Sequence, residues 1–244
     1  MLIQRSSVSV MYKRIDGIKK AYYNSEGILK RYFGEATVLP VPDDAPAEIP
    51  RIVVKTLHEH AQLNISLEAA TFEVVYDAGY ERDWNLCVHY IEERMQSVFE
   101  FLNLLTGNCY EYIGIISNII FDELDEDGVK KLSGTLLNMK QIRQPYDISV
   151  KYTFVEEENI FINLTLQNIR KYKDDINAGE AGAFSAENQI AEAVGAVIDI
   201  NDRYGFNNDV NYKSDSQKLG TLLTCMNSIV NSKLYDLLER GEYC

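Results

Sequence analysis

Alternation of apolar and polar residues predicts two β-hairpins in the chain. In residues 63–67 (LNISL) every second side chain is apolar, and residues 71–76 (TFEVVY) supply a partner strand. Residues 146–154 (YDISVKYTF) alternate in the same way, turn at EEEN and return as residues 160–169 (IFINLTLQNI). Side chains on a strand point alternately to its two faces, so this pattern buries one face of each hairpin and leaves the other in water.

A change to helical spacing predicts two long helices and a short one. Across residues 84–105 apolar side chains recur every three or four positions, and Asp83 is suited to be the N-cap. The last helix is predicted at residues 214–239, where Ser214 and Gln217 have the spacing of a capping box. The short helix follows the acidic stretch DELDEDG, between the two long ones.

Two more apolar runs, residues 110–121 and 193–201, are predicted to be strands. Paired strands with helices grouped between them indicate an α+β fold. We therefore expect a largely antiparallel sheet, built from two hairpins plus further strands and packed by two long helices and one short helix. Because hairpin, strand and long helix occur twice, a second interpretation is that the body consists of two similar halves, 51–140 and 141–244.

The first 50 residues differ in composition from this body, which spans residues 51–244. Residues 1–36 form a basic, tyrosine-rich segment, in which the turn residues YNSEG favour a hairpin over a helix. Residues 37–50 hold four of the five prolines. Proline fixes φ and lacks an N–H, so this stretch is interpreted as an extended connector.

Composition places the chain among globular proteins. Apolar residues make up 46% of it and charged residues 25%, as in other packed domains. The sequence has neither an apolar run of the roughly 20 residues that cross a bilayer nor a start typical of a signal peptide. We therefore expect a cytoplasmic protein without membrane contact. Its four cysteines are far apart and form no CxxC pair, which favours free thiols.

Charge is unevenly distributed along the chain. The net charge is −13, yet residues 1–34 hold seven Lys or Arg against two acidic residues and so carry +5, which leaves −18 on the rest. Because contacts to phosphates need cations, we expect no nucleic-acid binding except through residues 1–34. Simple solubility, or docking of this basic segment on the acidic body, is the interpretation that we favour.

Two short stretches contain residue types that bind metals. His58 and His60 have the spacing of a His-x-His pair, but zinc needs one or two further ligands. Asp122 and Glu123 begin the stretch DELDEDG, whose alignment with an EF-hand loop places a glycine where a bidentate glutamate is required. Acidic residues before a helix favour capping instead. Both pairs are secondary candidates, and we predict no bound metal and no cofactor.

The stretch DINDR is the best candidate for a site of any kind. It supplies Asp199, Asn201, Asp202 and Arg203, and carboxylates of this kind bind Mg²⁺. In an extended strand Asp199 and Asn201 face one way and Asp202 the other, so one ion needs a bend to use all three. We favour a strand that ends in an Asx-rich turn, where Gly205 supplies a positive φ.

Two stretches, LPVPDDAPAEIPRI (39–52) and VIDINDRYGFN (197–207), resemble a sporadically distributed family of uncharacterised bacterial and phage-borne proteins. The likeness extends in layout over residues 33–240. Members of such a family are scattered as if carried on mobile elements, so the resemblance implies a role in defence, counter-defence or stress. It supplies no site residues, and residues 1–32 lie outside it.

The sequence favours a binding protein over an enzyme. The motifs GxGxxG, GxxxxGK[ST], GxSxG and HExxH are all absent. The acidic body and the 16 tyrosines suit an interaction surface. We therefore predict a non-enzymatic module that binds another protein and forms a homo-oligomer. Two alternatives stay open: a metal-dependent hydrolase or nuclease using Asp199 and Asp202, and a nucleotide sensor using Arg51 and the basic segment.

Overall fold

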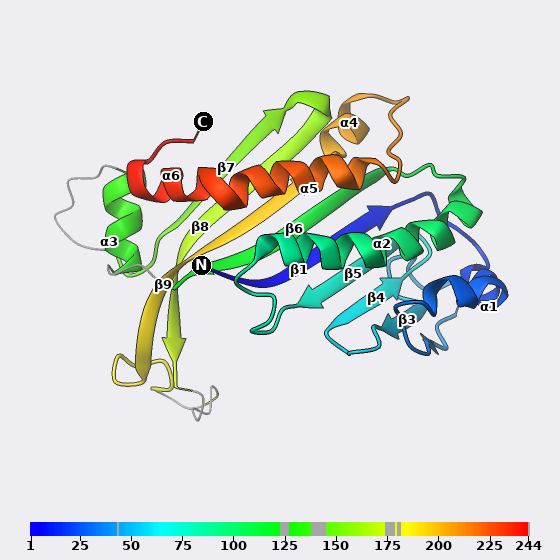
Figure 1. The fold of residues 1–244 in the computed structure, drawn as a ribbon, viewed down its shortest axis with the longest axis horizontal. Helices are drawn as coiled ribbons and strands as arrows, with labels where there is room; N and C mark the ends of the chain where they lie inside the picture. The colour runs from blue at the N-terminus through cyan, green and yellow to red at the C-terminus, as the bar shows by residue number, and fades with distance from the viewer. Residues whose placement is uncertain (43, 123–126, 138–144, 174–178, 180–181, 244) are drawn as a thin grey trace.

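In a computed structural model of the protein, the described residues form nine strands of one sheet, in the order β2-β3-β4-β5-β1-β6-β9-β8-β7 (Figure 1). Neighbouring strands are antiparallel throughout, so the expected α+β fold with a largely antiparallel sheet is confirmed. The structure describes residues 1–42, 44–122, 127–137, 145–173, 179 and 182–243. The strands are β1 (Leu2–Met11), β2 (Thr37–Val38), β3 (Ile52–Lys55), β4 (Ala61–Ile65), β5 (Ala69–Val75), β6 (Tyr112–Phe121), β7 (Ser149–Glu156), β8 (Ile160–Tyr172) and β9 (Gln189–Asn201).

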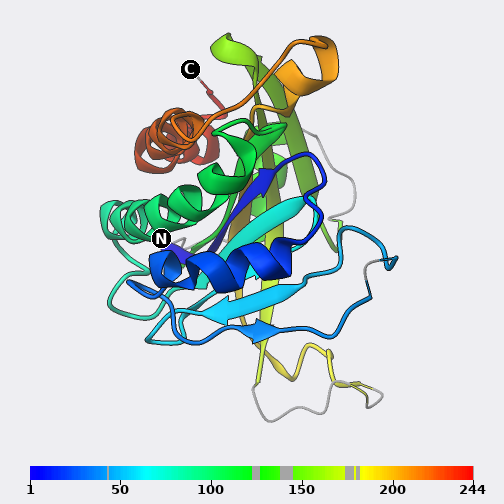
Figure 2. The same ribbon diagram turned by 90° about the vertical axis from the view of Figure 1, so that its right-hand side faces the viewer.

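The longer helices lie on one side of this sheet (Figure 2). The last of them is continuous, and a π-helical turn separates its two α-helical parts. No helix in the described ranges is both long and apolar enough to span a bilayer. The helical elements are α1 (Ile18–Leu29), α2 (Trp84–Thr106), α3 (Gly128–Leu132), η1 (Ser133–Leu137), η2 (Glu157–Asn159), α4 (Arg203–Asn208), α5 (Lys218–Ser228), η3 (Ile229–Lys233) and α6 (Leu234–Arg240).

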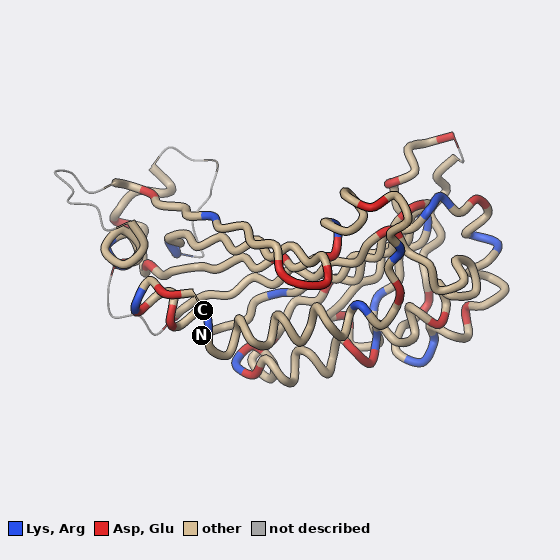
Figure 3. The backbone as a smooth tube through the Cα atoms, turned by 90° about the horizontal axis from the view of Figure 1, so that it is seen from above, with Lys and Arg blue, Asp and Glu red and all other residues tan. Residues whose placement is uncertain are grey.

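Every second strand residue points toward these helices and forms the core. At the centre of the sheet, Val8 of β1, Ile115 of β6 and Ile198 of β9 are completely buried. The opposite face, here called the open face, carries none of the longer helices (Figure 2). The short helix α4 packs on it at one end, where its Tyr204 and Phe206 contact Phe161 of β8 and Tyr112 of β6. Figure 3 shows that this face is concave, because both ends of the molecule rise around its middle. Antiparallel sheets commonly leave one face in water in this way.

The strand order shows two halves of the same topology. The first runs β1, α1, β3, β4, β5, α2, and the second runs β6, α3, β7, β8, β9, α5. Their strands are arranged as β3-β4-β5-β1 and β6-β9-β8-β7, which is the same order reversed. A pseudo-two-fold axis therefore passes between β1 and β6. The repeat divides the chain between α2 and β6, and not near residue 140, because β1 belongs to the first half.

Residues 1–36 are part of the body and not a segment apart from it. β1 lies in the centre of the sheet, between β5 and β6. The expected hairpin is wrong, because α1 follows β1 and buries Ile18 and Tyr22. The Tyr22 ring contacts Phe101 of α2, with ring centroids 6.3 Å apart. Burial of this apolar side outweighs the turn preference of Asn-Ser-Glu-Gly, since tertiary contacts override weak local propensities.

Other predicted elements are present, with one change at a helix start. Both hairpins form, as β4–β5 and β7–β8. Asp83 caps α2, because its side chain accepts hydrogen bonds from the N–H groups of Asn85 and Leu86, the second and third residues of that helix. The last helix begins at Lys218 and lacks the predicted capping box. Ser214 is instead hydrogen-bonded to Asp202.

Candidate functional site

Asp199 and Asn201 lie on the open face, near the end of β9. A chain of side-chain hydrogen bonds crosses three strands there. Thr153 of β7 donates to Asn163 of β8 at 2.9 Å. Asn163 in turn donates to Asp199 at 3.2 Å, and Asn201 donates to the other oxygen of Asp199 at 2.8 Å. Two amide donors thus satisfy this carboxylate on the surface of the sheet.

Asp202 lies on the other side of the strand end and is completely buried. Its Oδ1 accepts the Ile113 N–H at 2.6 Å, and its Oδ2 accepts the hydroxyls of Tyr212 at 2.7 Å and Ser214 at 2.5 Å. Burial, and secondly this hydrogen bond, raises the pKa of Tyr212, so the phenol stays a donor at neutral pH. Hydrogen bonds to a charged acceptor are strong. Asp202 therefore joins β6 to the segment before α5 as a structural carboxylate.

Gly205 has another role than the predicted one. It lies within α4, and the positive φ expected for it is wrong. A Cβ at this position would come within 2.4 Å of the Tyr212 ring. The missing side chain allows Tyr212 to pack on α4 and reach Asp202. The stretch is thus a strand followed by a short helix, whose glycine makes room for an aromatic ring.

Arg203 lies beyond the end of β9, on the same side of the sheet as Asp199 and Asn201. It is exposed on α4, and its guanidinium carbon lies 5.4 Å from the ring centroid of Tyr112. The four residues of the predicted site therefore divide into an open-face pair, a buried carboxylate and an exposed cation. This separation follows the strand alternation read from the sequence. In this arrangement they do not converge on one ion.

The two histidines lie in the turn between β3 and β4, and both are exposed. His60 Nε2 lies 3.6 Å from the Asp77 carboxylate, and Glu59 between the histidines has a positive φ of 59°. The strand geometry that would place His58 and His60 side by side is therefore absent from this turn.

Of the acidic stretch, Asp122 is described and Glu123 lies outside the described residues. Arg82 Nη2 donates to Asp122 at 2.9 Å. Asp127 caps α3 by accepting the Val129 N–H at 2.9 Å, as expected for an acidic stretch before a helix. Across the described ranges, no group of three or more His, Cys, Asp or Glu side chains has the geometry to hold a metal ion.

Arg51, the residue proposed for nucleotide binding, is completely buried. Its guanidinium donates to the backbone carbonyls of Ile49 at 2.5 Å, Ala45 at 3.1 Å, and Pro42 and Pro46 at 3.3 Å each. These bonds hold the proline-rich connector against β3. Four carbonyls thus accept from Nη1 and Nη2, the terminal guanidinium nitrogens that a phosphate would need.

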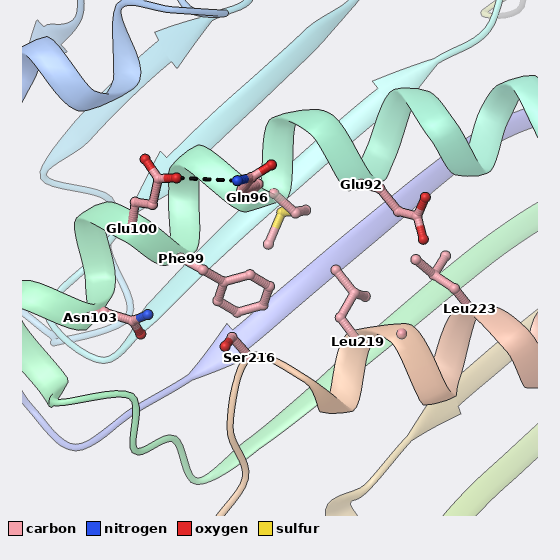
Figure 4. A pocket seen from close by; sticks show the side chains of 10 residues that line it. Glu92, Gln96, Phe99, Glu100, Asn103, Ser216, Leu219 and Leu223 are labelled. Atoms are coloured by element: carbon pink, nitrogen blue, oxygen red, sulfur yellow. Dashed lines mark hydrogen bonds between the residues drawn. The ribbon is translucent and has the colours of Figure 1, made fainter.

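A groove of about 400 Å³ lies between α2 and the start of α5, the long helices of the two halves. We call it the interhelical groove. Figure 4 shows Phe99 between the two helices, with Leu219 and Leu223 opposite it. These three side chains and Met95 form an apolar floor, each 7% exposed or less. The floor is therefore part of the packed core, and its small exposed area borders the groove.

The rim of the interhelical groove is acidic. Glu92 and Glu100 are exposed on α2, and Gln96 between them donates to Glu100 at 3.4 Å. The residues that line the groove include no Lys and no Arg. On the α5 side Gly220 leaves the groove open, because a Cβ added there would meet no heavy atom within 4 Å. Apolar floor, carboxylate rim and open glycine thus occur together.

No model of a known protein family matches the chain, and no curated protein is similar to it. The resemblance to proteins of mobile elements accordingly stays a prediction. The fold and the geometry of the described residues are what the functional argument rests on.

Sequence reasoning missed the interhelical groove. Met95 falls within the helical apolar spacing of residues 84–105 and Leu219 within the predicted last helix, and both are buried. Phe99 and Leu223 lie beside them and widen the apolar side of each helix toward the other. That widening, together with Gly220 inside the predicted helix of residues 214–239, is the signal that was present in the sequence.

Proposed function

We propose that the protein is a non-enzymatic module that binds another protein, and that the interhelical groove takes a basic amphipathic helix of this partner. The observation that carries the proposal is the pairing of an apolar floor with a rim whose charged residues are all carboxylates. A partner helix would place apolar residues over Phe99 and Leu219 and basic residues beside Glu92 and Glu100. Recognition of an amphipathic helix in an apolar groove is a common mode of peptide binding.

Charge supports a basic partner over an acidic one. The chain carries −13 in total, so a basic segment is attracted from a distance as well as at the rim. Complementary charge mainly raises the association rate and the specificity, while the apolar contacts hold the complex. The rim holds no tyrosine, so the tyrosine-rich surface predicted from the sequence is not the one used in this proposal.

The two alternative functions have less support. A metal-dependent hydrolase needs several ligands at one point, whereas Asp199 and Asp202 lie on opposite faces of the sheet. A nucleotide sensor would need the Arg51 guanidinium, which is buried and bonded to backbone carbonyls. A homo-oligomer, a cytoplasmic location and a role on mobile elements remain predictions from the sequence.

The test compares peptide binding by the parent protein and by a variant in which a bulky side chain fills the interhelical groove. The probe is a fluorescein-labelled amphipathic helix of leucine and lysine, followed by fluorescence anisotropy, with a leucine–glutamate peptide as the charge control. Gly220→Trp should weaken binding at least about tenfold, or ~1.4 kcal/mol. Gly27→Trp is the matched control, because Gly27 also lies in a helix and an added Cβ there also meets nothing within 4 Å.

A second pair of variants separates charge from shape. Glu92→Gln with Glu100→Gln should weaken binding of the lysine peptide and reduce its dependence on salt, because screening acts on exposed charges. Equal binding of both peptides, or unchanged binding in Gly220→Trp, would refute the groove as the partner site.

A further inference from the structure

A second cavity, here called the seam cavity, lies where the two halves meet at one end of the sheet. Its volume is about 540 Å³, within the range of small-molecule sites. Residues 13–15 and 105–111 line it from the first half and the connection to β6, and residues 206–213 line it from the second. The last of these ranges begins three residues after the stretch DINDR, so the best sequence candidate leads into a cavity.

The walls of the seam cavity are partly apolar and open to solvent. Ile15 and Leu105 are half-buried, Phe206 is 39% exposed, and Val210 is fully exposed. A single exposed apolar side chain is ordinary on a protein surface. Here the exposed pair borders one cavity of sufficient size, which suits a ligand with an apolar body.

Cations from both halves reach the same cavity. Lys13 and Lys213 are exposed, and within the described part of the chain neither forms an ion pair or a hydrogen bond through its ammonium group. Arg14 also lines the cavity, and its Nε donates to Asp16 at 2.9 Å. Three cations thus surround an opening in a chain that is acidic overall.

Two carboxylates belong to the same lining. Asp209 accepts the Asn211 N–H at 2.9 Å, which directs one oxygen into a turn of its own loop. Glu111 directly precedes β6, and its backbone N–H donates to the carbonyl of Met11 at the end of β1, at 2.8 Å. The lining therefore keeps a net charge of +1, from three cations and two carboxylates, while the whole chain has −13.

We propose that the seam cavity binds a small organic anion with an apolar body, such as an aromatic or aliphatic carboxylate, sulfonate or phosphate. The apolar part lies against Ile15, Leu105 and Phe206, and the anionic group lies between Lys13 and Lys213. This ligand contacts both halves at once. The inference goes beyond the proposed function, because it concerns a different cavity and a different class of ligand.

The experiment uses two fluorescent probes on the whole chain. The first is 1-anilinonaphthalene-8-sulfonate, which carries a sulfonate on an apolar body, and the second is the neutral N-phenyl-1-naphthylamine. We expect one sulfonate probe per chain. The double variant Lys13→Glu with Lys213→Glu should weaken its binding at least about tenfold, while binding of the neutral probe changes less than about twofold. Lys20→Glu, at an exposed lysine of α1 outside the cavity, is the matched control and should behave as the parent.

Unchanged sulfonate binding in the double variant would overturn the proposal, as would equal losses for both probes. Loss of the sulfonate probe in Gly220→Trp would also overturn it, by placing the probe in the interhelical groove. Conversely, if the lysine peptide does not bind the interhelical groove, the conclusion about sulfonate binding in the seam cavity is unaffected. Because the probe also binds partly unfolded protein, each variant is checked for the parent circular dichroism and unfolding midpoint. Both lysines are exposed, so these substitutions are expected to fold.

Discussion

Ser6 Oγ and Ser117 Oγ lie 2.8 Å apart and are buried between the sheet and the helices. Ser6 belongs to β1 and Ser117 to β6, and the two residues are directly opposite in the antiparallel register. The pair therefore lies where the two halves meet in the sheet, between β1 and β6. A one-residue slip of either strand would move its own hydroxyl to the other face and bring open-face side chains of that strand into the core, so the pair supports a single register.

Breaking the pair should be costly, and removing both members less so. Ser6→Ala or Ser117→Ala leaves the other hydroxyl of the buried pair without this partner. We expect each substitution to lower the free energy of unfolding by about 1–3 kcal/mol. The double variant should lose clearly less unfolding free energy than the sum of the losses in the two single variants. Urea unfolding measures this, with Ser7→Ala on the open face as a control expected within about 0.5 kcal/mol. Additive losses would mean that the two hydroxyls are not coupled.

Asp202 and Asp199 should respond very differently to the same substitution. Asp202→Asn removes the buried carboxylate that three donors share and turns an amide toward one of them, so we expect a loss of about 2–4 kcal/mol. Asp199→Asn, in the half-buried ladder on the open face, should cost less than about 1 kcal/mol. Urea unfolding with and without chelator compares the two. A larger loss for Asp199→Asn, or a chelator effect on the parent, would favour the metal-dependent alternative.

Local patterns were enough to predict some elements and not others. The two hairpins and the long helices have partners close in sequence or a period of their own, so alternation and helical spacing reveal them. β1 could not be placed in this way, because its neighbours β5 and β6 lie about 60 and 110 residues further along, as the pairs Ser9–Thr71 and Ser6–Ser117 show. Long-range pairing of this kind leaves no local signal.

The same reason explains the candidate site. Asp199 and Asn201 were correctly separated from Asp202 by strand alternation alone. The partners of Asp202 are 89, 10 and 12 residues away, and only the folded chain brings Ile113, Tyr212 and Ser214 to it. Gly205 was assigned to a turn because glycine is common there, whereas its reason is the distant ring of Tyr212.

Cys87 should be the least reactive of the described thiols. It is completely buried in α2, and burial raises its pKa from 9.0 to about 12, so the reactive thiolate is scarce at pH 8. Burial raises the pKa of Cys225 as well, and Cys109 is half-buried. We expect alkylation by iodoacetamide in the order Cys109, Cys225, Cys87, measured by peptide mass spectrometry.

Raising the pH to 9 should not make the alkylation rate of Cys87 equal to that of the other thiols, because its pKa in the folded protein lies well above that pH. Unfolding in urea should make the rates equal, since it restores the ordinary pKa of the Cys87 thiol and exposes it to solvent. Rapid labelling of Cys87 without denaturant would show that α2 opens locally, a motion which the packed core does not predict.

Arg51 should hold the proline-rich connector in place and have no part in binding nucleotides. Its guanidinium holds the carbonyls of Pro42, Ala45, Pro46 and Ile49, and its fork of donors is what allows one side chain to reach them together. Arg51→Lys keeps the charge but has a single ammonium, so it should release most of these contacts. We expect faster proteolytic cleavage within residues 39–50 and a loss of about 2–4 kcal/mol, measured by limited proteolysis and urea unfolding. Arg5→Lys, on the exposed side of β1, is the control and should leave cleavage unchanged. A nucleotide that stabilises the parent but not Arg51→Lys would contradict the structural role and restore the sensor interpretation.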